Sequence, residues 1–368
     1  MRLNELKIGG LTIKVPIFQG GMSVKVSTAP LVAAVANEGG VGLIGGTGIS
    51  VAELEDQIRR TRELTNGIFG VNVMVAIDNF LDIVKACVRE KVHMIAVGAG
   101  FSREIFKLCH NTGVEVVPIV SSAKAAKMSE KLGANAVIVE GGDAGGHLGT
   151  NIPVWDLIPE TRAAVKIPVI AAGGLVDGGD IAEMISLGAD GVQLGNRFVL
   201  SDECDVHPNF KKVFLEAREE DMTTIRSPVG YLGSAVKTPF VEKFLKNEFV
   251  KITQCTNCLK VCSRSFCILE RLKMARDGDI ENGLFFAGRN VYKIKDILPV
   301  KEIFRRLVEE TNEKLAALES TGELPSHKPH EKPDLASSEK IPSQFRKLRK
   351  NSPRSQDKTP LPKETPVA

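Results

Sequence analysis

The sequence lacks any apolar run long enough to span a bilayer, and its first residues, from Met1 to Lys7, lack the apolar core of a signal peptide. We therefore expect a cytoplasmic protein that is not bound to a membrane. The chain also lacks a large excess of charge of either sign. The formal net charge is only +3 at pH 7, so the body of the chain offers no sign of nucleic-acid binding. No G-x-G-x-x-G motif opens a βαβ unit, which argues against a dinucleotide-binding fingerprint.

Cysteine is scarce over most of the chain and is then concentrated in one place. The chain has seven cysteines, an odd number that does not suit a disulfide framework. Four of them fall within thirteen residues, at Cys255, Cys258, Cys262 and Cys267. Thiolates at this spacing can close on one metal centre. We predict a [4Fe–4S] cluster here, with zinc and uncoordinated thiols as the alternatives.

Apolar stretches alternate with amphipathic, helix-like stretches through the first 200 residues. Most of the apolar stretches are rich in branched residues and end in glycine or another small residue, as buried parallel strands of a barrel do. Eight such units is the number that closes a TIM (β/α)8 barrel, which is the predicted α/β fold. An open doubly wound sheet is the alternative. The predicted strands begin near residues 17, 41, 69, 93, 114, 136, 168 and 191.

The alternation stops after Phe198. Residues 201–290 carry helix-like stretches and the four clustered cysteines, so we expect a helical insertion after strand eight. An amphipathic stretch from Lys295 to about Leu318 is expected to be the last barrel helix. The tail contains ten Lys or Arg and six Asp or Glu, with much Pro and Ser, and is predicted to be disordered. The predicted domains are a barrel of residues 1–200 and 291–320, an insertion of residues 201–290 and a basic Pro-rich tail of residues 321–368.

The candidate active site is the stretch from Ala136 to Gly149, which begins as a strand and continues as a glycine-rich loop. Gly146 and its neighbouring glycines let the backbone approach another molecule closely. His147 is the titratable ring in this loop, and histidine can give or take a proton near neutral pH. A turn with an idle histidine is the alternative. Glu140 and Asp143 flank the loop and could orient His147 or simply be solvated.

Two further glycine turns follow predicted strands seven and eight, at Gly173-Gly174 and at Gly195-Asn196. In a TIM barrel these strand ends often bind phosphate through backbone N–H groups. The alternative is that both are ordinary tight turns. One phosphate site and no dinucleotide motif favour FMN over FAD.

Five motifs follow one another along the chain: Gln19-Gly-Gly-Met22, Phe69-Gly-Val-Asn72, the Gly-Gly-His segment, Ala171-Ala-Gly-Gly174 and Gln193-Leu-Gly-Asn-Arg-Phe198. Together they resemble the nitronate monooxygenase family, formerly 2-nitropropane dioxygenase. The FMN-type enoyl-ACP reductases share this superfamily. The resemblance covers about residues 5–200 and resumes at Pro299. It implies a TIM barrel with FMN at its mouth.

The resemblance also implies residue roles. His147 matches the catalytic histidine. Gly21 and Met22 would lie against the flavin ring, Asn72 would hydrogen-bond it or its ribityl chain, and Gln193 would approach it from below. The phosphate would be held by Gly173, Gly174, Gly195 and Asn196, with Gly146 also among the cofactor-binding residues. Asn196 replaces the usual threonine, and Phe286-Ala-Gly-Arg289 stands where many relatives carry a Gly-Gln pair.

The predicted function is FMN-dependent oxidation of an alkyl nitronate by O2, with His147 as the acid–base group. One alternative is an NAD(P)H-dependent flavin reductase such as an enoyl-ACP reductase. Another is a non-catalytic scaffold that passes electrons through flavin and metal to a protein partner. The expected partners are a small-molecule substrate, an electron-transfer protein in the third case and a second copy in a homodimer.

Overall fold

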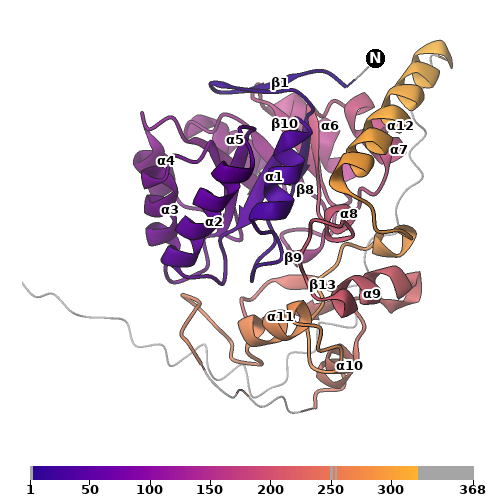
Figure 1. The fold of residues 1–368 in the computed structure, drawn as a ribbon. Helices are drawn as coiled ribbons and strands as arrows, with labels where there is room; N and C mark the ends of the chain where they lie inside the picture. The colour runs from indigo at the N-terminus through magenta and orange to yellow at the C-terminus, as the bar shows by residue number, and fades with distance from the viewer. Residues whose placement is uncertain (1–2, 249–251, 253–254, 322–368) are drawn as a thin grey trace, which may run out of the picture. The chain divides into compact units, whose positions relative to one another are not determined.

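A closed barrel of eight parallel strands forms the centre of the computed structural model, which describes residues 3–248, 252 and 255–321 (Figure 1). The described residues lie within one compact unit, Met1–Pro333. The barrel confirms the predicted fold. Its strands, in order around the barrel, are β10 (Val169–Ala172), β11 (Gly191–Leu194), β3 (Ile17–Gln19), β4 (Val41–Gly45), β5 (Phe69–Met74), β6 (Met94–Gly98), β7 (Glu115–Val120) and β8 (Val137–Glu140).

Helices follow the strands and cover the outside of the barrel. Two of them begin with a capping box, Ser50 with Glu53 and Asp177 with Asp180. In each box, the side chain of either residue accepts a hydrogen bond from the backbone N–H of the other. The helices are α1 (Ala29–Asn37), α2 (Val51–Leu64), α3 (Phe80–Arg89), α4 (Glu104–Cys109), α5 (Ala123–Lys131), α6 (Val154–Ala164), α7 (Gly178–Ser186) and the short α8 (Asn196–Val199).

The last barrel helix, α12 (Val300–Thr321), returns from the far side of the insertion and packs against α7 and α1. Close approach to α7 is possible because Gly178 has no side chain: a Cβ there would lie 2.4 Å from Glu310 Cβ. The Gly178 amide donates to Glu310 at 2.9 Å, and the Thr311 hydroxyl donates to the Gly178 carbonyl at 3.2 Å. The displaced helix predicted from the sequence is therefore confirmed.

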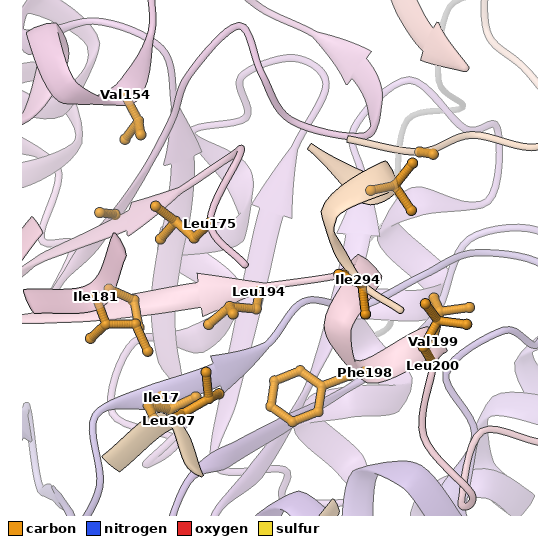
Figure 2. Close-up of a cluster of buried hydrophobic side chains, with 14 of the residues drawn as sticks. Ile17, Val154, Leu175, Ile181, Leu194, Phe198, Val199, Leu200, Ile294 and Leu307 are labelled. Carbon is orange, nitrogen blue, oxygen red and sulfur yellow. The ribbon is translucent and has the colours of Figure 1, made fainter. Parts of the chain in front are cut away.

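Two apolar layers hold the barrel. One fills its interior and includes Phe18, Leu43 and Ile138. The other lies between the strands and the outer helices, and Figure 2 shows Ile17, Leu194, Phe198 and Leu307 in it. Phe198 of α8 is fully buried, and its ring centroid lies 5.8 Å from that of Phe304 of α12. This contact joins α8 to α12.

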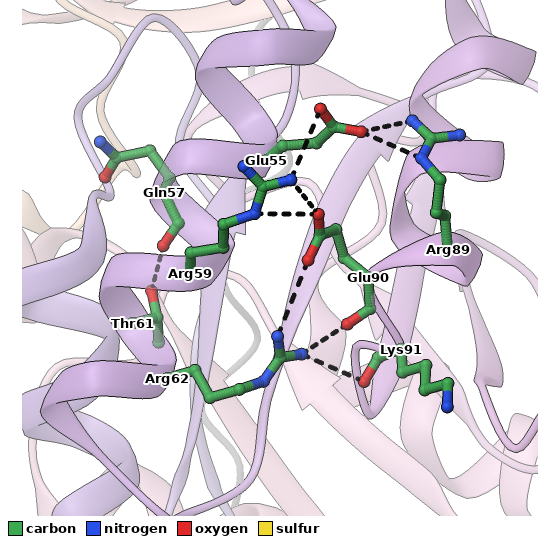
Figure 3. A network of polar contacts seen from close by, with 8 residues as sticks. All are labelled: Glu55, Gln57, Arg59, Thr61, Arg62, Arg89, Glu90 and Lys91. Atoms are coloured by element: carbon green, nitrogen blue, oxygen red, sulfur yellow. Dashed lines mark hydrogen bonds and ion pairs between the residues drawn. The ribbon is translucent and has the colours of Figure 1, made fainter.

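Ion pairs on the surface join α2 to α3 (Figure 3). Arg59 and Arg62 of α2 both contact Glu90, the C-cap residue of α3, and Arg89 of α3 contacts Glu55 of α2. The arginine side chains are 46–61% exposed, so water and salt screen each pair. The network orients two neighbouring helices and adds little to the total stability.

The insertion forms a cap over the barrel mouth, and it is not purely helical. It contains the predicted helices as α9 (Pro208–Glu216), α10 (Pro239–Leu245) and α11 (Ile268–Arg276). It also contains β12 (Met222–Arg226) and β13 (Leu232–Val236), which pair with β9 (Gly146–Leu148) in a three-stranded antiparallel sheet. The purely helical prediction was wrong because these strands are short and find a partner some 80 residues away in the sequence.

Three smaller points complete the description. An antiparallel hairpin of β1 (Leu6–Ile8) and β2 (Leu11–Ile13) precedes the barrel. The predicted disordered tail, beyond Thr321, lies outside the described residues. None of the described helices is both long enough and apolar enough to cross a membrane.

Removing the Phe198 ring should destabilise the protein strongly. Phe198→Ala empties a fully buried site between α8 and α12, and we expect a loss of about 3–5 kcal/mol of unfolding free energy. Urea denaturation followed by circular dichroism measures it. Phe101→Ala is the control, since Phe101 is 48% exposed, and should cost less than about 1 kcal/mol. Equal losses in the two variants would contradict the role assigned to Phe198.

Candidate active site

A cavity of about 590 Å³ lies at the carboxyl ends of the barrel strands, under the cap. We call it the main cavity. All ten catalytic and cofactor-binding residues predicted from the sequence line it, although they come from separate strand ends and loops. They are Gly21, Met22, Asn72, Gly146, His147, Gly173, Gly174, Gln193, Gly195 and Asn196. The fold therefore brings the predicted residues together in the place where TIM barrels carry their active sites.

The turns after β10 and β11 are shaped by glycine. Gly173 and Gly174 have φ of +104° and +80°, a region that residues with a side chain rarely adopt. A Cβ at Gly174 would also lie 2.9 Å from Asp143 Cβ. At Gly195 a Cβ would meet nothing within 4 Å, so this turn is open. The Asn196 side chain is engaged with the backbone of Gly288, at 3.2 and 3.3 Å, and only its backbone amide is left for a ligand.

The floor of the main cavity has glycines at positions 20 and 21 and contains a buried acceptor, Gln193 Oε1, that no described residue pairs. A Cβ at Gly21 would lie 2.3 Å from Asn72 Cβ, and one at Gly20 would lie 3.2 Å from Gln193 Cδ. Gln193 is only 9% exposed, and its Oε1 is buried with no hydrogen-bond partner among the described residues. A buried acceptor without a partner is costly. An N–H-bearing ring laid on this floor could supply the missing donor, which fits a flavin.

His147 lies on β9, opposite Gly233 of β13. Its Nε2 is 2.8 Å from Ser227 Oγ, and its ring meets the rings of Phe286 and Tyr231 edge-on, with centroids 5.3 and 6.3 Å away. Burial lowers the pKa of His147 to about 4, so the imidazole is neutral at pH 7. The residue that orients His147 in the structure is therefore Ser227.

Glu140 ends β8 and also lines the main cavity. No described residue donates a hydrogen bond to its carboxyl group or pairs with it. Burial raises the pKa of Glu140 to about 8, so the carboxyl is mostly protonated at pH 7. It can then donate a hydrogen bond instead of accepting one.

The four clustered cysteines do not form the predicted centre. Among the described residues, which include all four thiols, no three His, Cys, Asp or Glu side chains come close enough together to hold a metal ion. The structure therefore gives no support to a [4Fe–4S] cluster or a zinc site. Cys255 and Cys262 are exposed, and Cys258 and Cys267 are partly buried.

The path of the backbone from Cys255 to Cys267 explains why the four thiols do not converge. Its backbone runs along the loop after β5: Asp78 N donates to Cys258 O at 3.1 Å, and Lys260 N donates to Ala76 O at 3.0 Å. Cys267 then becomes the residue before α11. This path places Cys258 at the wall of the main cavity. The other three cysteines, Cys87, Cys109 and Cys204, are buried, as free cysteines often are.

The sequence analysis missed the residues that the cap supplies. Ser227, Tyr231 and Phe286 surround His147, yet they lie 80 or more residues beyond it. In the sequence, Phe286 stands out only as a departure from the motif of the family that the chain resembles. No local pattern marks Ser227, which lies between two short strands.

The fold and site define a (β/α)8-barrel protein with a capped cavity at the carboxyl ends of its strands. The family model for nitronate monooxygenase matches residues 4–88 and 78–310, so the chain belongs to that family, and it is an FMN-dependent oxidoreductase, as its motifs predict.

Three relatives illustrate the similarity. A "(3aS,4S,5R,7aS)-5-hydroxy-7a-methyl-1-oxo-octahydro-1H-indene-4-carboxyl-CoA dehydrogenase" of Rhodococcus jostii is 35% identical over 226 residues, which span 61% of this chain and 64% of that relative's length. The structure of FabK from Thermotoga maritima has 34% identity and a TM-score of 0.76, with 83% and 95% of the two chains covered. Nitroalkane oxidase from Streptomyces ansochromogenes has 25% identity and a TM-score of 0.71, with 82% and 97% covered.

The glycine turn after β10 should be needed for cofactor binding. Gly174→Ala places a Cβ against Asp143 in a positive-φ turn at the main cavity, and we expect purified protein with well under half the flavin of the wild type. Gly133→Ala is a matched control. Gly133 has φ of +96° but is far from the cavity lining, and a Cβ there meets nothing. Both variants should lose about 1–2 kcal/mol of stability. Full flavin content in Gly174→Ala would refute the prediction.

Proposed function

We propose that the main cavity holds FMN. The residues that would hold it are the glycine turns at Gly173, Gly174 and Gly195 for the phosphate, and Gly21, Met22 and Gln193 for the ring. The unpaired Gln193 Oε1 and the side-chain-free floor support this fit. One phosphate cradle suits FMN, which carries a single phosphate.

We infer that the reaction is the oxidation of an alkyl nitronate by O2. FMN, when bound, supplies the electron transfer between the two. The observation that carries the proposal is that a neutral imidazole, His147, and a protonated carboxyl, Glu140, line one cavity. His147 would take the α-proton of the neutral nitroalkane, which gives the nitronate, or return that proton to the same carbon. Glu140 would donate a hydrogen bond to the anionic nitro oxygens, and the cap would exclude water.

A second candidate is the NAD(P)H-dependent reduction of an activated double bond, such as that of an enoyl thioester. FabK, at 34% identity, and the Rhodococcus dehydrogenase, at 35%, are more similar to this chain than the nitroalkane oxidase at 25%. The same pair of residues suits this chemistry, since the neutral His147 could hydrogen-bond the thioester oxygen and the protonated Glu140 could supply a proton. Steady-state assays with a nitronate and O2, and with NAD(P)H and an enoyl thioester, separate the two.

Replacing His147 should remove turnover and leave cofactor binding. We expect His147→Ala to retain its flavin and lose about 10²–10⁴-fold in kcat, because general acid–base catalysis contributes this much. Flavin absorbance per chain and steady-state kinetics measure the two effects. His110→Ala is the control, since His110 is exposed at the end of α4, and should match the wild type. A His147→Ala enzyme of nearly normal kcat would reduce the residue to a structural role.

The pH profile should report both groups. His147 is neutral above about pH 4 and Glu140 is protonated below about pH 8, so kcat/KM should be highest between these values and fall on either side. In Glu140→Gln the amide donates at all pH values, so the alkaline fall should disappear while the acid fall remains. Asp78→Asn, which changes another carboxyl of the cavity lining, should keep both the acid fall and the alkaline fall of kcat/KM. If the alkaline fall of kcat/KM were unchanged in Glu140→Gln, Glu140 would not be the group that causes it.

A further inference from the structure

A second cavity of about 230 Å³ lies beside the main cavity, and we call it the side cavity. It is formed by the ends of β6 and β7, the loop after β6, helices α4 and α5, and the cap. Its wall is predominantly apolar, with Ser102 and Ser121 among its polar groups. Among the apolar residues are Val97, Phe106, Pro118, Ile119, Leu148 and Tyr231.

The two cavities meet at the acid–base pair. Glu140, His147, Ala99 and Ile119 line both of them. A substrate whose reacting atoms lie at His147 can therefore extend in two directions. One part faces the proposed flavin site, and the other enters the side cavity.

The side cavity has a volume of about 230 Å³, a predominantly apolar wall and an opening to solvent. A cavity of about 150 Å³ with an apolar lining binds benzene. By the same scale, 230 Å³ has room for roughly nine carbon atoms.

The loop that forms one wall is held in a strained conformation. Ala99 has φ of +49°, which is unfavourable for a residue with a side chain, and Gly100 has φ of +131°. Phe101, which also lines the side cavity, is 48% exposed. Backbone strain and an exposed aromatic ring in one loop are typical of a ligand-binding segment.

We propose that the side cavity binds an apolar arm of the substrate, an alkyl or alicyclic group of about six to nine carbons, and thereby selects among substrates. The proposal rests on the proposed function only in taking His147 and Glu140 as the place where the reacting atoms lie. It does not depend on whether the head group is a nitronate or a thioester.

The test measures binding without turnover. The FMN-loaded protein is titrated anaerobically with 1-nitroalkanes of two to twelve carbons, and separately with N-acetylcysteamine thioesters of saturated acids of the same lengths. The change in the flavin spectrum gives Kd. Each added methylene should tighten binding about fourfold until the side cavity is full, after which the affinity should level off.

Two variants change the size of the side cavity without touching the acid–base pair. Ala125→Leu adds three carbons to its wall, so binding should level off about three carbons earlier, with a Kd about 60-fold higher for the chain that just fills the wild-type cavity. Phe106→Ala enlarges the cavity, and binding should continue to tighten for longer chains. Two-carbon ligands should bind equally to all forms. Ala163→Leu, an exposed alanine of α6 that lines neither cavity, is the control and should match the wild type.

The outcomes separate the two proposals. A normal length dependence with no turnover of nitronate or enoyl thioester would refute the proposed function and support the side cavity. Turnover with no length dependence, or the same dependence in Ala125→Leu and Phe106→Ala as in the wild type, would refute the side cavity. Flavin content and melting temperature show whether each variant folds. If Ala125→Leu does not fold, Phe106→Ala decides alone.

Discussion

The short ladder between β9 and β13 is the interaction on which the site depends. Gly146, His147 and Leu148 pair with Ser234, Gly233 and Leu232, so a segment of the barrel's glycine-rich loop becomes a strand of the cap. Without this pairing, the glycines around His147 would leave the loop with much conformational freedom. The ladder orders the loop and holds the cap over the mouth at the same time.

Packing around this ladder explains why glycine stands opposite the histidine. A Cβ at Gly233 would lie 2.7 Å from the ring of Phe286, so only glycine lets this ring pack against the strand. Phe286 in turn meets the ring of His147 edge-on. Covering the ring in this way removes water from it, and Glu140 lines the same cavity. One cause, burial, therefore lowers the pKa of a base and raises that of an acid in a single cavity.

The barrel could be predicted from the sequence because its signals are local. Each predicted strand begins within about one residue of an observed one; the strand predicted to begin near residue 41, for example, is β4, Val41–Gly45. The capping boxes that begin α2 and α7, at Ser50 and Asp177, are equally local. Once eight parallel strands close, their carboxyl ends must meet at one mouth, so glycines and polar residues at those ends converge without further information.

The cap could not be predicted in the same way, because its contacts are not local. Met222–Arg226 and Leu232–Val236 are short, and they become strands only by pairing with each other and with β9. Ser227 acquires a role only because this sheet brings it 2.8 Å from His147.

The clustered cysteines show the limit of arguments from spacing. Four thiols within thirteen residues are close along the chain, but a metal site also needs the chain to fold back so that the thiols converge. Here the backbone of the segment is engaged elsewhere, with Leu259 bridged to Ile77 and Lys260 bonded to Ala76. These bonds draw the segment out along the barrel mouth. They place Cys258 and Leu259 in the wall of the main cavity, so the segment helps to enclose the site in this structure and does not form a centre of its own.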